Sequence, residues 1–207
     1  MIMGCPDGMV IRTRLLLGNP LSRGIVRKWG VWRARRIDQL IGEYLEQEYK
    51  VLDFGAGDCI ISDAYRKKGY DVTPADIEDL SLVKGLDPVI FDGRQLPFED
   101  DAFDLAMILT VLHHTSNPEE VLREAMRVSR RLVIVEDIFA SRWGYRLTCF
   151  VDSLQNQEFG GHPHTNKTDV EWKGLFGDFG LELVDAKYSR WVILLKQATY
   201  YLEKPRA

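Results

Sequence analysis

One short run of aspartate and glycine, Asp53-Phe54-Gly55-Ala56-Gly57, carries the clearest chemical signal in this sequence. It follows an apolar segment and precedes a segment with helical character, so the chain has the order strand, glycine turn, helix. Gly55 and Gly57 let the main chain approach a ligand closely, and the first turn of the helix offers free N–H groups. Asp76 ends the next apolar segment, 21 residues after Gly55, where its carboxylate can accept hydrogen bonds from both hydroxyls of a ribose. The pattern predicts a nucleotide-type binding crevice.

Two classes of adenosine-containing ligand fit such a crevice, the dinucleotides and S-adenosylmethionine. A dinucleotide site requires a third glycine where this chain has Ile60, and Asp58 would put negative charge where the pyrophosphate lies. Asp53 would also repel a pyrophosphate, but it suits a ligand that carries an ammonium and a sulfonium group. Electrostatics therefore favour S-adenosylmethionine, and a nicotinamide-dependent enzyme remains the alternative.

Strands and helices alternate from residue 50 onward. The apolar run 103–110 is continuous, as expected of a strand that is buried on both faces, and Asn117-Pro118-Glu119-Glu120 has the residues of a capped helix start. The alternation predicts an α/β fold with a doubly wound, mostly parallel sheet of seven strands. We expect strands at 51–54, 71–75, 87–91, 103–110, 132–136, 182–189 and 197–203, and helices at 58–68, 117–128 and 168–179.

An N-terminal helical extension, residues 1–48, precedes this alternation. Asn19-Pro20 has the residues of a helix start, and apolar side chains then recur at spacings of three and four. The expected helix covers about residues 20–48, with a basic face opposite its apolar stripe. A basic face of this kind leaves contact with a membrane surface or another anionic partner open.

A long segment without periodicity, residues 139–167, lies within the expected single domain of residues 1–207. It contains aromatic side chains and the pair His162 and His164, which precede Asp169. Because no further ligand follows at a fixed spacing, we expect no metal site. Long segments of this kind are typically lids or binding elements, so we expect a lid or an acceptor-site insertion here.

The composition restricts the partners and the location of the protein. Its net charge is −4, but residues 1–50 hold nine Lys/Arg against five Asp/Glu, and the remainder holds 18 against 26. The acidic main part argues against a nucleic-acid partner. No apolar run approaches the roughly 20 residues that span a bilayer, and the three cysteines are isolated. We therefore expect a cytoplasmic protein without a transmembrane segment.

Four sequence blocks together resemble the class I S-adenosylmethionine-dependent methyltransferases, in particular the small-molecule branch called methyltransferase type 11. The blocks are VLDFGAGDC, Asp76, DGRQLPFEDDAFDLAMILTVLHH and NPEEVLREAMRV, and the resemblance extends roughly from Val51 to Glu136. The third block, an acidic turn followed by LPF, a second acidic run and a strand that ends before two histidines, is the most specific. The resemblance implies the doubly wound fold, S-adenosylmethionine as cofactor and a small-molecule or lipid-like methyl acceptor.

The resemblance also implies which residues contact the cofactor. At its methionine end the implied residues are Asp53, Gly55, Ala56, Gly57, Leu109 and Thr110. Among them Asp53 would hold the amino group directly or through water, and the strand end at Leu109 and Thr110 would contact the cofactor through its main chain.

At the adenosine end, the resemblance implies that Asp76 binds the ribose and that Ile77 packs on the adenine. Asp92 would accept a hydrogen bond from the adenine amino group, with the main chain of Gly93 beside it. An aspartate that caps the turn before Gly93 is the alternative for Asp92.

The chain departs from the family pattern in two places. Cys59 stands where the family commonly has a third glycine, which could weaken binding of the cofactor. Ser129-Arg130-Arg131 replaces a Pro-Gly-Gly turn before the fifth strand, so we expect a shorter or differently built loop there. Neither departure removes an implied contact with the cofactor.

Catalytic residues are weakly encoded, because methyl transfer from a sulfonium needs mainly position and desolvation. A general base is required only if the acceptor is protonated. His113 and His114 follow the fourth strand, and Glu136 and Asp137 end the fifth, so all four are candidates at the mouth of the sheet. We prefer His114, because the family places its more recurrent histidine there; His113 and Asp137 are the further candidates. Each also has a structural alternative, as a packed histidine or a solvated strand end.

The sequence therefore predicts an S-adenosylmethionine-dependent methyltransferase that acts on a small-molecule or lipid-like acceptor. One alternative is a non-catalytic S-adenosylmethionine-binding module. Another is an RNA or protein methyltransferase, which the basic N-terminal helix keeps open. The acceptor, the methylated atom and the oligomeric state are left undetermined by the sequence.

Overall fold

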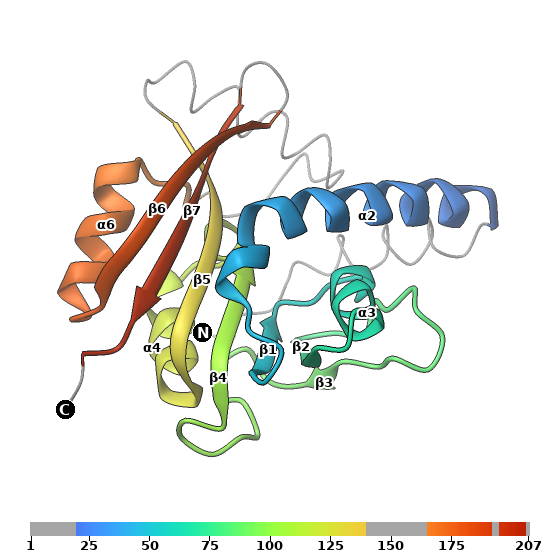
Figure 1. The fold of residues 1–207 in the computed structure, drawn as a ribbon, viewed down its shortest axis with the longest axis horizontal. Helices are drawn as coiled ribbons and strands as arrows, with labels where there is room; N and C mark the ends of the chain where they lie inside the picture. Colours follow the sequence, from blue (N-terminus) through green and yellow to red (C-terminus); the bar gives the residue numbers. More distant parts are fainter. Residues whose placement is uncertain (1–19, 140–164, 192–194, 206–207) are drawn as a thin grey trace.

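A seven-stranded sheet with helices on both faces forms the body of the protein (Figure 1). The computed structural model describes residues 20–139, 165–191 and 195–205. The strands are β1 (Lys50–Phe54), β2 (Asp71–Asp76), β3 (Val89–Ile90), β4 (Phe103–Leu109), β5 (Ser129–Ile138), β6 (Glu182–Trp191) and β7 (Leu195–Glu203). The helices are α2 (Pro20–Ile41), α3 (Ile60–Lys67), α4 (Pro118–Val128) and α6 (Asp169–Asp178), with short 3-10 turns η1 (Gly42–Tyr44) and η2 (Leu112–His114).

The strand order is β3-β2-β1-β4-β5-β7-β6. β1 to β5 run parallel, whereas β7 is antiparallel to both β5 and β6. The predicted doubly wound, mostly parallel sheet is therefore confirmed. The order reverses between β1 and β4, and in open α/β sheets ligands bind beyond the carboxyl ends of the strands at such a reversal.

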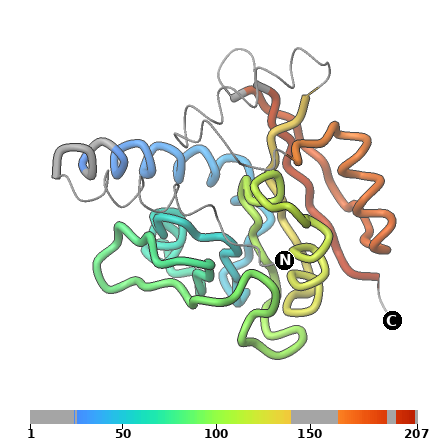
Figure 2. The backbone as a smooth tube through the Cα atoms, turned by 180° about the vertical axis from the view of Figure 1, so that it is seen from behind, coloured from blue at the N-terminus to red at the C-terminus, as the bar shows by residue number. Residues whose placement is uncertain are grey.

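Each face of the sheet has its own apolar core. α4 and α6 pack on one face, where Leu122 and the fully buried Trp172 meet alternate side chains of the central strands. α2 and α3 cover the other face with Ile37, Ile41 and Tyr65, and Figure 2 shows this two-sided arrangement from behind. Burial on both faces explains the continuous apolar run of β4.

The N-terminal helix is shorter than the sequence predicts. α2 ends at Ile41 rather than near residue 48, and the turn η1 follows it. In this turn Tyr44 stacks on Tyr201 of β7 at a centroid distance of 4.8 Å and donates a hydrogen bond to Asp185 at 2.7 Å. Contacts with sheet residues that are distant in sequence therefore favour the turn over a continued helix after Ile41.

Other boundaries also differ from the expectation. α3 begins at Ile60 rather than at residue 58, because Cys59 adopts a left-handed backbone with φ 58°. β3 has only two residues, and Ser129-Arg130-Arg131 are the first residues of β5, so α4 passes into the strand without an intervening loop. Most of the expected lid, residues 140–164, and the first 19 residues lie outside the described part.

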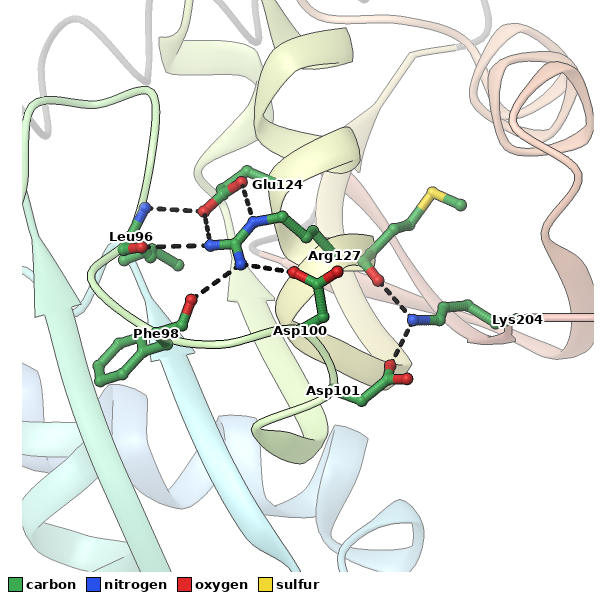
Figure 3. Close-up of polar contacts among 8 residues, drawn as sticks. Leu96, Phe98, Asp100, Asp101, Glu124, Arg127 and Lys204 are labelled. Carbon is green, nitrogen blue, oxygen red and sulfur yellow. Dashed lines mark hydrogen bonds and ion pairs between the residues drawn. The ribbon is translucent and has the colours of Figure 1, made fainter.

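The acidic LPFEDD run of the third sequence block has a structural role at the amino end of β4 (Figure 3). Arg127 of α4 donates hydrogen bonds to the carbonyl oxygens of Leu96 at 3.2 Å and Phe98 at 2.8 Å, and to the carboxylate of Asp100 at 2.8 Å. Glu124 pairs with Arg127 at 2.6 Å and accepts from the Leu96 N–H at 2.7 Å. The run therefore fastens this loop to α4, at the end of the sheet opposite the glycine turn.

Candidate functional site

The glycine turn after β1 packs tightly between β2 and the loop after β4. The N–H groups of Gly55 and Ala56 both donate to the carbonyl oxygen of Ala75, at 2.9 and 3.1 Å. Gly55 has φ +80°, and a Cβ atom there would lie 2.6 Å from Cγ2 of Val111. Gly57 also has a positive φ, of +53°. Only glycine fits at residue 55, because of its positive φ and its contact with Val111, whereas the space beside Gly57 is open.

Asp53 lies beneath this turn and is 2% exposed. Its carboxylate accepts a hydrogen bond from the Ser62 hydroxyl of α3 at 2.6 Å. Burial raises the pKa of Asp53 to about 6, while the Ser62 hydroxyl and the positive charge of Arg33 act in the opposite direction. Asp53 is thus an almost enclosed carboxylate that attracts a cationic group above the turn.

Asp76 at the end of β2 connects the glycine turn to the next segment. Its Oδ2 accepts from the Gly57 N–H at 2.7 Å, and its Oδ1 accepts from the Ile77 N–H at 2.7 Å. Burial raises the pKa of Asp76, and these backbone donors counteract the shift. The Glu78 N–H also donates to Oδ1, at 3.4 Å, so of about four acceptor sites on the carboxylate one, on Oδ2, stays available to a ribose hydroxyl while Asp76 fixes the turn.

Ile77 follows β2, and Asp92 and Gly93 follow β3; the sequence predicts all three at the adenine. A Cβ atom on Gly93 would come within 3.3 Å of Cγ2 of Ile77, and the Ile77 side chain is 40% exposed. Oδ1 of Asp92 accepts from the N–H groups of Arg94 at 2.9 Å and Gln95 at 3.0 Å, and these donors lower its pKa. Asp92 therefore caps the turn, which is the alternative role given for it in the sequence analysis. Its contact with adenine stays a prediction.

An arginine that the sequence analysis did not select reaches the end of β4. Arg33 of α2 donates from Nη2 to the carbonyl oxygen of Leu109 at 3.1 Å and to Oγ1 of Thr110 at 2.8 Å. Thr110 has a left-handed backbone with φ 59°, and its N–H donates to Val135 at 2.7 Å. Two predicted residues, Leu109 and Thr110, are thus held by a cation from outside the matched blocks.

Close packing of α2 against α3 brings Arg33 to this position. A Cβ atom on Gly30 would lie 2.4 Å from Cδ1 of Ile60 and 3.0 Å from Oδ2 of Asp58. Arg33 follows Gly30 by almost one helical turn and lies at the border of the buried face. A charged residue at the edge of an apolar stripe is the signal that would have identified it.

His113 and Glu136 form a buried pair at the loop after β4. His113 is 1% exposed, and its Nδ1 lies 2.5 Å from Oε2 of Glu136. Oε1 of Glu136 accepts from the N–H groups of Val111 at 3.0 Å and Leu112 at 2.8 Å. Glu136 therefore fixes the backbone that follows Thr110, and His113 is part of this support.

His114 and Asp137 are the more accessible candidates at the same edge. His114 is half-buried, and its ring lies 4.1 Å from that of His113. Asp137 is also half-buried and accepts from Nε2 of Gln197 at 3.1 Å. A catalytic role for either residue, or for His113, stays a prediction.

Two further features bear on cofactors and membranes. In the described ranges, no three His, Cys, Asp or Glu side chains gather in a way that could bind a metal ion. His162 and His164 lie outside those ranges. Within them, no helix combines the length and apolar character needed to cross a membrane.

The part of the chain that matches a known family contains the central strands of the sheet. Residues 52–134 match the family model of the methyltransferase domain. The chain is 31% identical over 131 residues to a demethylmenaquinone methyltransferase of Paenarthrobacter aurescens, which covers 58% of this chain and 49% of that protein. It is 32% identical over 142 residues to the ubiquinone/menaquinone biosynthesis C-methyltransferase UbiE of Roseobacter denitrificans, with 58% and 53% covered. The chain thus spans about half the length of these relatives.

Solved structures share the fold. A SAM-dependent methyltransferase of Methanosarcina mazei has a TM-score of 0.61 at 21% identity, covering 80% of this chain and 97% of that one. Magnesium protoporphyrin IX methyltransferase of Synechocystis PCC 6803, solved with bound SAH, has a TM-score of 0.63 at 16% identity, covering 96% and 95%. The family match over residues 52–134 and this shared fold confirm the predicted resemblance to the class I S-adenosylmethionine-dependent methyltransferases.

Proposed function

We propose that the protein transfers a methyl group from S-adenosylmethionine to a small-molecule or lipid-like acceptor. The observation that carries the proposal is the turn Gly55–Gly57 at the reversal of strand order, with the buried carboxylate of Asp53 before it and that of Asp76 bound to the Gly57 N–H. The match of residues 52–134 to the methyltransferase domain and the names of the relatives support the same activity.

The charges around the turn fit the two ends of the amino-acid part of this donor. Asp53 and Asp76 supply negative charge below and beside the turn, which suits an ammonium and a sulfonium. Arg33 supplies a half-buried cation at Leu109 and Thr110, which suits a carboxylate. A pyrophosphate would instead face Asp53 and Asp58, so the alternative of a nicotinamide cofactor is disfavoured.

The remaining predicted contacts complete the donor site in this proposal. Asp76 would hold the ribose, Ile77 would pack on the adenine, and Asp92 with Gly93 would lie at the adenine edge. The exposed apolar surface of Ile77 beside Gly93 supports this placement, because a flat aromatic ring would cover it.

When bound, the donor supplies an already activated methyl group. The protein's part is to hold the acceptor in line with it and to exclude water. The buried Glu136–His113 pair keeps the loop after β4 rigid, and His114 beside it could orient the acceptor or remove its proton. Asp137, held by Gln197, is a second group that could bind or deprotonate the acceptor.

The acceptor class in the proposal is a small molecule with an apolar body. The relatives' names indicate quinone-like acceptors for those proteins, and we extend that class to this chain as a proposal. A non-catalytic donor-binding module and an RNA or protein methyltransferase are the alternatives. A cytoplasmic location likewise stays a prediction.

Contact with an anionic membrane surface is a further part of the proposal. Trp29 and Trp32 of α2 are 43% and 50% exposed, and Arg27, Lys28 and Arg35 are exposed on the same helix. Exposed tryptophans beside cations are typical of segments that lie at an anionic lipid interface. Sedimentation with vesicles that contain anionic lipid should show binding that weakens in Trp29→Ala/Trp32→Ala. Binding that needs no anionic lipid, or stronger binding to RNA, would contradict this part.

Titration calorimetry and a turnover assay test the main proposal. We expect S-adenosylmethionine and S-adenosylhomocysteine to bind and NAD not to bind. Formation of S-adenosylhomocysteine should then depend on an acceptor, with demethylmenaquinol and simpler quinols as the first panel. Binding of NAD without binding of S-adenosylmethionine would refute the proposal, and donor binding without turnover on any acceptor would favour the non-catalytic module.

A further inference from the structure

A cavity of about 370 Å³ lies at the carboxyl end of β5, beside the first turn of α6. Its walls come from the end of β5, the start of α6 and the facing ends of β6 and β7. The lining residues are Ile138, Phe139, Asp169, Tyr188, Ser189, Arg190 and Lys196. A volume of this size is within the range of about 300–1,000 Å³ that is usual for small-molecule sites.

Two cations, Arg190 of β6 and Lys196 of β7, line this cavity from neighbouring strands. They are register partners in the antiparallel pair β6–β7, so their side chains leave the same face of the sheet. Like charges directly opposite each other destabilise a strand pair. In the described ranges, neither side chain has an ion pair to offset this cost. Both side chains are exposed, so water and salt screen part of this repulsion, and a bound anion would offset it further.

The acidic side chain that lines the cavity, Asp169, is already neutralised by other groups. Its carboxylate accepts from Lys173 Nζ at 2.9 Å, from the Tyr200 hydroxyl at 2.9 Å and from the Tyr188 hydroxyl at 3.0 Å. The contact with Lys173 is an ion pair as well as a hydrogen bond. The positive charge of Arg190 and Lys196 is therefore not cancelled within the lining.

The rest of the lining is largely apolar or aromatic. Ile138 is 7% exposed at the floor, and Phe139 and the ring of Tyr188 extend the surface. A ligand that fills this space would place an apolar or aromatic body against these residues and an anionic group against the two cations.

We propose that the cavity binds the anionic end of the methyl acceptor, an anionic group joined to an apolar or aromatic body. This inference rests on the proposed function. The cavity lies at the same edge of the sheet as the glycine turn, and three strand spacings, about 14 Å, separate β1, which the turn follows, from β7. An acceptor that carries its anionic group and its methylated atom at opposite ends of an extended body would bridge that distance.

The test compares 2-naphthoate with 2-naphthamide, two probes with the same rings and different charge. Titration calorimetry on the full chain measures both in the wild type and in Arg190→Gln/Lys196→Met. The matched control is Lys84→Met/Arg130→Gln, which removes the same charge from two exposed positions outside the cavity. Thermal unfolding checks that each variant is folded, and titration with S-adenosylhomocysteine is done on the same samples.

We expect the wild type and the control to bind naphthoate at least tenfold more tightly than naphthamide, and the cavity variant to lose this preference. Equal binding of the two probes, binding of neither, or a preference that survives in the cavity variant would overturn the inference while leaving the donor site intact. Failure of S-adenosylhomocysteine to bind would instead overturn the proposed function, and with it the acceptor role of the cavity.

Discussion

Arg33 provides the sharpest test of how the donor site is completed. The guanidinium is half-buried and already donates to Leu109 at 3.1 Å and Thr110 at 2.8 Å, so it is positioned before any ligand binds. A charge-assisted hydrogen bond contributes about 1.5–3 kcal/mol. At 1.4 kcal/mol for each factor of ten, Arg33→Gln should weaken binding of S-adenosylhomocysteine by about 10- to 150-fold.

The assay separates contact with the carboxylate from an effect on the fold. 5′-Methylthioadenosine shares the adenosine and the sulfur but lacks the amino-acid part, so its affinity should stay within about twofold of wild type in Arg33→Gln. Arg33→Lys is the matched control, since it keeps the charge and loses the planar donor pair; it should retain part of the affinity. Equal weakening of both ligands would show that Arg33 only supports the loop at Thr110, and unchanged affinities would remove it from the site.

The structure predicts the effects of three further substitutions. Gly55→Ala, which places a Cβ 2.6 Å from Val111 at φ +80°, should abolish donor binding in calorimetry, whereas Gly85→Ala, also at positive φ but with open space around it, should not. Burial raises the pKa of Asp53 in the folded state to about 6 from 3.8. Its contribution to the free energy of unfolding is therefore full below pH 4 and is lost as the pH rises through 6, a decrease of about 3 kcal/mol. Denaturant unfolding of Asp53→Asn across this pH range should not show that decrease. Arg127→Ala leaves Leu96, Phe98 and Glu124 without their shared donor and should lower the unfolding free energy by about 2–4 kcal/mol, and an unchanged midpoint would refute the role of this residue.

The parts of the fold that depend on local signals were predictable from the sequence. The glycine turn at residues 55–57 and the capped start of α4 at Asn117 are set by residue type and spacing, and both lie where expected. β4 was predictable because a strand that is buried on both faces is apolar throughout. The doubly wound, mostly parallel sheet was predictable from the alternation of strands and helices, which leaves few topologies.

The parts that depend on distant contacts were not predictable. α2 ends early because Tyr44 stacks on Tyr201, more than 150 residues later in the chain. Arg33 and Glu136 bind backbone groups at the end of β4 and in the loop after it; the position of Arg33 beside an apolar stripe marks it as a border residue, but the partners of both residues are distant in sequence.

A crystal structure grown with S-adenosylhomocysteine tests the central claim most directly. The account predicts density over the turn Gly55–Gly57, with the carboxylate at Arg33, the ribose at Asp76 and the adenine on Ile77. Density for the ligand at another site, or an unliganded turn at a concentration that saturates binding in solution, would contradict it.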